Sequence, residues 1–110
     1  MNLASTRYID IHSHPHFEAF DADRKEMLNR MRKAEVATIA VGTDLESSNQ
    51  AVALAESEES VWATVGLHPN DKHDELFDTK SFEALLTHPK VVAIGECGLD
   101  YARLPSYDDC

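Results

Sequence analysis

The sequence contains little cysteine, glycine or proline, and few basic residues. Its 110 residues include two Cys, four Gly and four Pro. The two cysteines, Cys97 and Cys110, form neither a CxxC pair nor a disulfide framework, which favours a reducing, cytoplasmic location. The first residues lack the apolar core of a signal peptide, and the apolar runs are too short to span a membrane. We therefore expect no membrane partner.

Basic residues are also too few to attract nucleic acid by charge alone. Ten Lys and Arg stand against 20 Asp and Glu, which gives a formal net charge of -10. DNA binding normally depends on cationic side chains that neutralise phosphates. A nucleic-acid role would therefore require bound metal ions or a local basic patch. The hydrophobic fraction of 43% is sufficient for a buried core, and the length suits a single domain over residues 1–110.

Short β-rich segments alternate with helical patterns along the whole chain. The β-rich segments cover residues 7–14, 37–42, 61–66 and 91–96. Amphipathic helical patterns lie between them, over residues 21–35, 45–59 and 79–88. Parallel strands joined by right-handed helical crossovers give this alternation. The sequence therefore predicts an α/β fold with a parallel βαβαβαβ arrangement.

The sequence ends soon after the fourth β-rich segment, with "GLDYARLPSYDDC" and no fourth helical pattern. One interpretation is a complete, small doubly wound domain. The other, which we favour, is strands one to four of a larger (β/α)₈ barrel of the TIM type, with its C-terminal half absent. Two open sheet edges would then be available for self-association.

The stretch "YIDIHSHPHF" concentrates histidines on a predicted strand. Because side chains alternate across a strand, one face is expected to carry Tyr8, Asp10, His12 and His14. Two neighbouring imidazoles on one face suit a divalent metal ion. Pro15 has no N–H to donate and should end the strand, so His16 is expected to leave this face.

Glu96 ends the fourth β-rich segment and points to the same site. A carboxylate facing inward after an apolar run is costly unless it is paired or binds a cation. The carboxyl ends of parallel strands form one rim, where active sites of such folds are built. His68, in "GLHPND", lies at this rim, although a structural hydrogen bond in a turn is the alternative. Asp44 is either a rim residue or a helix cap, and Asp10 could orient a ligand histidine.

Three segments, "DIHSHPHF", "VGLHPND" and "IGECGLDYARLP", occur in an order and spacing that resemble the TatD-type metal-dependent deoxyribonucleases of the amidohydrolase-like superfamily. The resemblance covers essentially the whole chain. It implies a (β/α)₈ barrel that binds two divalent metal ions and hydrolyses phosphodiester bonds of DNA. It also implies that His12 and His14 bind one ion, that Glu96 is a catalytic carboxylate bridging both, and that His68 lies near the substrate phosphate.

Further expectations follow from residue positions and from this resemblance. Arg103 is a candidate phosphate contact from its position beyond the fourth strand. The family's later ligands, two histidines and an aspartate, have no counterpart here, so we expect the chain to be inactive unless self-association completes a barrel. The ligand types are compatible with Mg, Mn and Zn. The alternatives are an amidohydrolase acting on a small molecule and a non-catalytic fragment.

Overall fold

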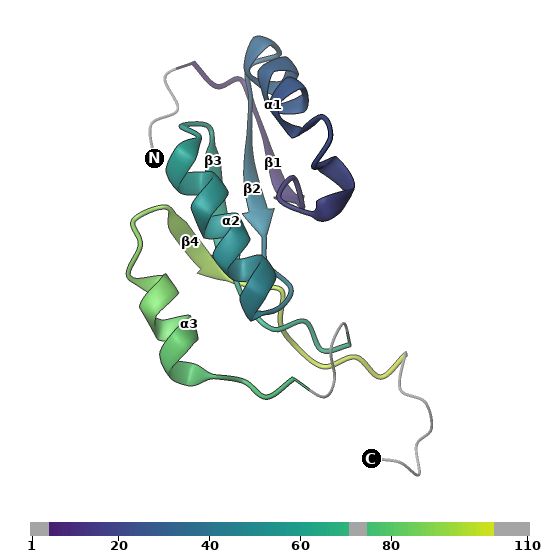
Figure 1. Cartoon of the computed structure of the whole chain (residues 1–110), viewed down its shortest axis with the longest axis vertical. Coiled ribbons are helices and arrows are strands. Elements are labelled where there is room, and N and C mark those ends of the chain that lie inside the picture. The colour runs from purple at the N-terminus through teal and green to yellow at the C-terminus, as the bar shows by residue number, and fades with distance from the viewer. Residues whose placement is uncertain (1–4, 71–74, 103–110) are drawn as a thin grey trace.

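The structure is a computed structural model, and it describes residues 5–70 and 75–102. In these residues, four strands alternate with three α-helices (Figure 1). The strands are β1 (Tyr8–Ser13), β2 (Val36–Val41), β3 (Val61–Val65) and β4 (Val91–Ile94). The helices are α1 (Arg24–Lys33), α2 (Leu45–Ser57) and α3 (Thr79–Leu86), with a 3-10 turn, η1 (Glu18–Phe20), before α1. Within the described ranges, no helix has the length and apolar character needed to cross a membrane.

The strands form one parallel sheet in the order β1-β2-β3-β4. Because parallel crossovers are almost always right-handed, a sheet that grows in one direction carries all its helices on one face. A doubly wound sheet would instead reverse its strand order at a switch point. The structure thus confirms the predicted βαβαβαβ arrangement, and its order is that of half a (β/α)₈ barrel.

The core lies between the sheet and the helices, and α2 packs across β2 and β3 (Figure 1). All five residues of β3 are buried. The facing surfaces of α2 and the sheet are rich in alanine, which lets the helix approach closely, as at Ala40, Ala51, Ala55 and Ala63. The outer strands are less covered, and several of their large apolar side chains are exposed: Tyr8, Ile9, Ile11, Val92 and Ile94.

Helix α1 begins at Arg24, later than the predicted residue 21. Asp23 occupies the N-cap position, but its side chain makes no capping hydrogen bond. The carboxylate of Asp21 instead accepts a hydrogen bond from Arg24 at 2.7 Å. The same guanidinium donates to the carbonyl oxygens of Pro15 and Phe17, each at 2.7 Å. Arg24 therefore fixes the segment that joins β1 to α1.

Helix α2 begins with a capping box. The Asp44 carboxylate accepts a hydrogen bond from the backbone N–H of Ser47 at 2.7 Å, and the Ser47 hydroxyl accepts one from the N–H of Asp44. These bonds satisfy two backbone donors that have no partner within the helix. Asp44 is thus the N-cap of α2, which is the second of the two roles considered for it from the sequence.

Strand β1 contains an irregularity between Asp10 and Ser13. Asp10 pairs with Thr38 and Ser13 pairs with Ala40, so three steps on β1 match two on β2. Thr38 and Ala40 share a face of β2, and therefore Asp10 and Ser13 share a face of β1. The prediction that Asp10 shares a face with His12 and His14 is therefore wrong, because the extra residue in β1 inverts the alternation of side chains after Asp10.

Candidate metal centre

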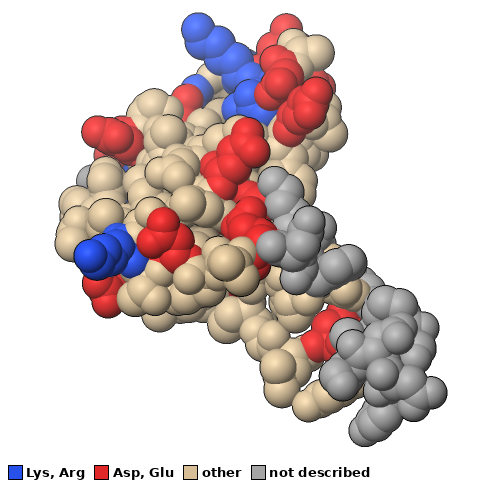
Figure 2. Space-filling model, turned by 60° about the horizontal axis from the view of Figure 1, so that its bottom comes forward, with Lys and Arg blue, Asp and Glu red and all other residues tan. Residues whose placement is uncertain are grey.

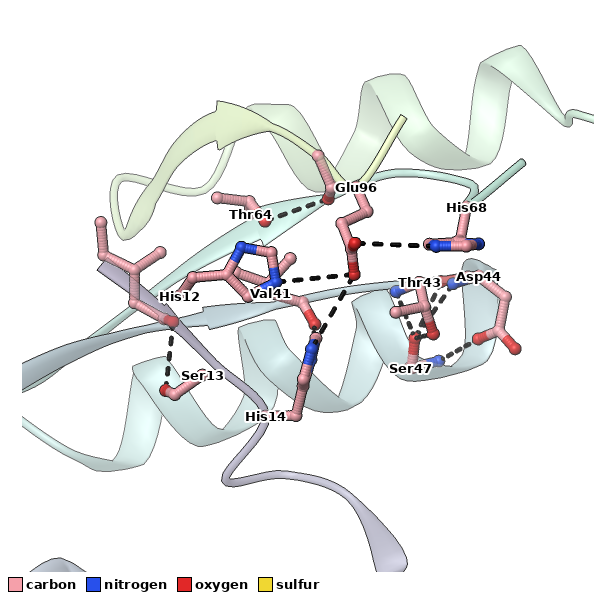
Figure 3. Close-up of polar contacts among 12 residues, drawn as sticks. His12, Ser13, His14, Val41, Thr43, Asp44, Ser47, Thr64, His68 and Glu96 are labelled. Carbon is pink, nitrogen blue, oxygen red and sulfur yellow. Dashed lines mark hydrogen bonds and ion pairs between the residues drawn. The ribbon is translucent and has the colours of Figure 1, made fainter. Parts of the chain in front are cut away.

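Three potential metal ligands meet at the carboxyl-terminal rim of the sheet. His12 lies on β1, His14 follows that strand, and Glu96 follows β4. Oε2 of Glu96 is 3.7 Å from Nε2 of His12 and 3.8 Å from Nε2 of His14. One ligand atom from each residue lies within 4.8 Å of the others. Figure 3 shows both rings directed at the carboxylate. The structure thus brings together the three residues predicted to bind metal.

The hydrogen bonds of His14 select the tautomer that a metal ligand requires. Its Nδ1 lies 2.8 Å from the carbonyl oxygen of Val41 (Figure 3). A carbonyl only accepts, so Nδ1 carries the proton and Nε2 of the neutral ring presents a lone pair toward Glu96. The ring also stacks on Phe17, with centroids 4.4 Å apart. His14 is therefore held in an orientation suited to coordination.

His68 has the opposite tautomer. The backbone N–H of Asn70 donates to Nδ1 of His68 at 3.1 Å, so the proton of the neutral ring is on Nε2. This Nε2 lies 3.7 Å from Oε1 of Glu96. The backbone N–H of His68 donates to the carbonyl of Thr43 at 2.7 Å, which ties the loops after β2 and β3 together. His68 therefore presents a donor at the rim, which suits an anionic oxygen better than a metal ion.

Close backbone contacts set the position of Glu96. Its N–H donates to the carbonyl of Gly42 at 2.8 Å, and the N–H of Gly95 donates to Val65 at 2.9 Å. The hydroxyl of Thr64 donates to the carbonyl of Gly95 at 3.0 Å (Figure 3). The peptide between Gly95 and Glu96 is cis. The backbone before the carboxylate is thus anchored to the ends of both β2 and β3.

The remaining predicted residues have different positions. The carboxylate of Asp10 accepts a hydrogen bond from the backbone N–H of His12 at 3.1 Å. Asp10 therefore contacts the backbone of His12 and does not orient its imidazole ring through this bond. Arg103, the other predicted phosphate contact, lies outside the described residues. Cys97 is exposed and has no disulfide partner in the described part of the chain.

His16 is a residue that the sequence did not single out beyond its leaving the strand face. It is only 6% exposed, and both ring nitrogens are buried without a hydrogen-bond partner among the described residues. Burial, together with the charges of His14 and Arg24, lowers the pKa of His16 to about 4, and Asp44 opposes this shift. The ring is therefore neutral at pH 7. The HxHxH spacing alone did not distinguish this buried ring from the two candidate ligands, His12 and His14.

The surface around the rim is acidic. Figure 2 shows Asp and Glu side chains spread over the face turned toward the viewer, with Lys and Arg near its upper and left edges. Such a surface repels phosphate. Cations held by His12, His14 and Glu96 would offset this repulsion at the rim.

Active sites of barrel folds are built at the carboxyl-terminal rim of the sheet, and this is where His12, His14 and Glu96 meet. The chain belongs to the TatD related DNase family, whose model matches residues 9–109. It is 46% identical over 88 residues to the 3'-5' ssDNA/RNA exonuclease TatD of Cronobacter turicensis, covering 76% of this chain and 33% of that protein. It is 40% identical over 98 residues to the uncharacterized metal-dependent hydrolase YjjV of Escherichia coli K12.

The crystal structure of YjjV, a TatD homologue from Escherichia coli K12, is similar to this structure with a TM-score of 0.71 and 36% sequence identity. The match covers 86% of this chain and 38% of that one. The chain thus spans about a third of the length of the curated relatives it matches. The family resemblance inferred from the sequence is confirmed.

Proposed function

We propose that this chain carries the first part of a metal-dependent site that hydrolyses phosphodiester bonds of DNA. The convergence of His12, His14 and Glu96 carries the proposal, because their ligand atoms lie within 4.8 Å of one another. Two imidazole nitrogens and a carboxylate oxygen suit Zn or Mn, and a carboxylate with phosphate oxygens suits Mg. Relatives named as an exonuclease and a metal-dependent hydrolase support this assignment.

We expect the complete site to hold two ions, with Glu96 among the residues that would bind them. Its Oε2 faces His12 and His14, and its Oε1 faces His68, so each oxygen is directed to a different side. Bound divalent ions lower the pKa of a coordinated water and stabilise charge on the attacking and leaving oxygens. Glu96 would be the catalytic carboxylate in this scheme, because its two oxygens are directed to different sides of the rim. The described residues contain one group of three ligands, so the second ion requires donors from elsewhere.

His68 and Arg103 would hold the substrate. The Nε2–H of His68 would donate to an oxygen of the scissile phosphate, since its Nδ1 already accepts from Asn70. Arg103 would add a positive charge beside the same phosphate. Replacing Arg103 by Ala should therefore weaken DNA binding and reduce its dependence on salt concentration by about one phosphate contact. An unchanged salt dependence would remove Arg103 from the site.

We further propose that residues 1–110 form one partial barrel domain, and that a second copy completes the barrel in the cytoplasm. The strand order leaves β1 and β4 as open edges, and both expose large apolar side chains, such as Tyr8 and Val92. Pairing of each edge with the other edge of a second copy would preserve the parallel arrangement. It would also bring a second set of His12, His14 and Glu96 to the same rim. The free and exposed Cys97 supports a reducing compartment.

The deciding experiment measures cleavage of single-stranded DNA by this chain over a range of protein concentrations, with Mn²⁺ or Mg²⁺ and with EDTA. We expect cleavage per chain to rise with concentration as dimers form, and to disappear with EDTA or with Glu96→Gln. Glu83→Gln, an exposed carboxylate on α3, is the matched control. A folded chain that binds no metal through Glu96 would overturn the proposal.

Two further measurements on the same chain, turnover of a small amide and metal binding, separate the two alternatives from the proposed nuclease. Turnover of a small amide, without turnover of oligonucleotides, would identify an amidohydrolase. Metal binding that depends on Glu96, without cleavage at any concentration, would identify a non-catalytic chain. Both results would contradict the nuclease assignment while leaving the family membership unchanged.

A further inference from the structure

The first residue of α1 holds two residues of the segment that follows β1. The guanidinium of Arg24 donates to the carbonyl oxygen of Pro15 through Nε and to that of Phe17 through Nη2, each at 2.7 Å. A guanidinium is planar and permanently charged, so two such bonds fix the orientation of both carbonyls. The side chain of Arg24 is only 24% exposed, which limits competition from water. The two anchored residues come directly after the candidate ligand His14 and flank His16.

One of the anchored residues contacts a candidate metal ligand. The ring of Phe17 stacks on that of His14, with centroids 4.4 Å apart and ring planes 17° apart. The backbone N–H of Phe17 also donates to the carbonyl of His14 at 3.1 Å. The buried ring of His16 meets the ring of Phe17 edge-on at 4.8 Å. Phe17 is therefore packed against both histidine rings, and a displacement of its backbone would change its stacking on His14.

The stack restricts the ring of His14 in a way that its hydrogen bond does not. The bond from Nδ1 to the carbonyl of Val41 is one contact at one ring atom, and it leaves the tilt of the ring plane less restricted (Figure 3). The face of Phe17 fixes this plane. The plane matters because it aims Nε2, which lies 3.8 Å from Oε2 of Glu96. Groups that orient a ligand histidine typically change metal affinity by about 10- to 100-fold.

We propose that Arg24 is a positioning residue for the candidate metal centre and that it acts on His14 through Phe17. The inference rests on the proposed metal-dependent site and adds a residue of α1 to it. Arg24 holds the backbone of Phe17, and the ring of Phe17 holds the plane of His14. Neither Arg24 nor Phe17 contacts the ion or the substrate in this scheme. Loss of Arg24 should therefore loosen a ligand without removing it.

The first measurement follows the stack without metal. In EDTA, nuclear Overhauser effects between the ring protons of Phe17 and His14 report their contact in solution. We expect these effects in the parent chain, and we expect them to weaken in Arg24→Met, which retains an unbranched apolar side chain but removes the donors. Arg32→Met is the matched control, because Arg32 lies on the same helix and pairs with Glu58. This control should keep the stack.

The second measurement is the affinity for Mn²⁺ by calorimetric titration. Arg24→Met should bind the ion about tenfold more weakly than the parent chain, and Arg32→Met should bind it equally well. Phe17→Leu should show a similar loss, whereas Phe17→Tyr retains an aromatic face and should keep the parent affinity. The double variant with Arg24→Met and Phe17→Leu should lose little more than either single variant, because both act through one stack. Two independent losses would add instead.

The outcomes separate this inference from the proposed function. An unchanged stack in Arg24→Met, an affinity equal to that of the parent chain, or additive losses in the double variant would each overturn it. Arg24→Lys keeps the charge without the planar fork and replaces Arg24→Met if that variant does not fold; it should also weaken the stack. A parent chain that binds no Mn²⁺ would contradict the proposed function, and the Overhauser effects would still decide whether Arg24 positions His14.

Discussion

Gly66, at the end of β3, lies directly against the backbone of Glu96. A Cβ atom on residue 66 would stand 2.6 Å from the carbonyl oxygen of Glu96 and 2.6 Å from the carbonyl carbon of Gly95. Atoms that are not bonded do not approach so closely without displacement. The absence of a side chain at Gly66 is therefore a condition for the observed position of the candidate metal ligand.

Replacing Gly66 by Ala should lower metal affinity. The added methyl group must push the peptide before the Glu96 side chain away from β3, and overpacking of this kind costs about 1–3 kcal/mol. Calorimetric titration with Mn²⁺ measures the affinity, and urea unfolding measures the cost in stability. Gly95→Ala is the matched control, because a Cβ there would meet only the hydroxyl oxygen of Thr64, at 3.8 Å. Equal metal affinities in the two variants would contradict the argument.

Replacing Thr38 by Val should destabilise the irregular part of β1. The Thr38 hydroxyl donates to the carbonyl of Asp10 at 3.1 Å and also contacts the Ser13 hydroxyl, so it joins the two residues that flank the irregularity. Loss of these partly buried hydrogen bonds should lower the free energy of unfolding by about 1–2 kcal/mol. Thr87→Val removes one exposed bond to Ala84 and should change it much less. Urea unfolding measures the loss in both variants, and equal losses for Thr38→Val and Thr87→Val would contradict the prediction.

The buried ring of His16 should make the metal-free protein less stable in mild acid. Its pKa falls from 6.5 to about 4, chiefly through burial, so between these values the unfolded chain binds a proton that the folded chain does not. The free energy of unfolding should therefore be unaffected above pH 6.5 and decrease as pH falls toward 4, by at most about 3 kcal/mol.

Urea unfolding in EDTA at several pH values tests this expectation. In His16→Phe the ring that gains the proton is gone, so stability between pH 6.5 and 4 should depend less on pH than in the parent chain. NMR titration of His16 provides an independent measurement in the unmodified protein. Protonation of its ring near pH 6.5 in the folded state would contradict the prediction.

Charged residues at the sheet edges should weaken self-association. Tyr8 on β1 is 61% exposed and Val92 on β4 is 41% exposed, and each belongs to an unpaired edge. Tyr8→Lys and Val92→Lys place a charge where a second copy would bury an apolar contact. Sedimentation velocity should show a shift toward monomer in both variants. Leu76→Lys, at an exposed position outside the sheet, should leave the distribution unchanged. A parent chain that stays monomeric at high concentration would refute the completed barrel.

The sequence predicted the order and type of the elements because each has a simple pattern. Near-continuous apolar runs identify β2 and β3, whose residues are mostly buried, and amphipathic spacing identifies α2 and α3. The convergence of His12, His14 and Glu96 was also predictable, since the ends of parallel strands meet at one rim and all three residues occur at strand ends. The start of helix α1 was predicted less accurately, because Asp21, which resembles an N-cap in the sequence, forms an ion pair with Arg24 instead.

Other features depend on contacts between segments far apart in the chain. The irregularity in β1 arises from pairing with Thr38 and Ala40, so alternation within β1 alone placed Asp10 on the wrong face. The role of Gly66 depends on the approach of residues thirty positions later. The lowered pKa of His16 depends on burial and on charges from Arg24 and from Asp44, which is far along the chain. None of these contacts has a local signature in the sequence.

The ligands of the candidate metal centre come from the two strands that are not paired with each other. His12 and Glu96 are separated by 84 positions in the chain (96 − 12), and β2 and β3 lie between their strands in the sheet. An ion bound to both residues would link the two edge strands and would close a loop formed by the chain between His12 and Glu96. Ion binding should therefore await the assembly of all four strands, because long-range contacts form late and at high entropic cost. The rate of metal uptake during refolding would consequently report the completion of the sheet, rather than the formation of any one βα unit.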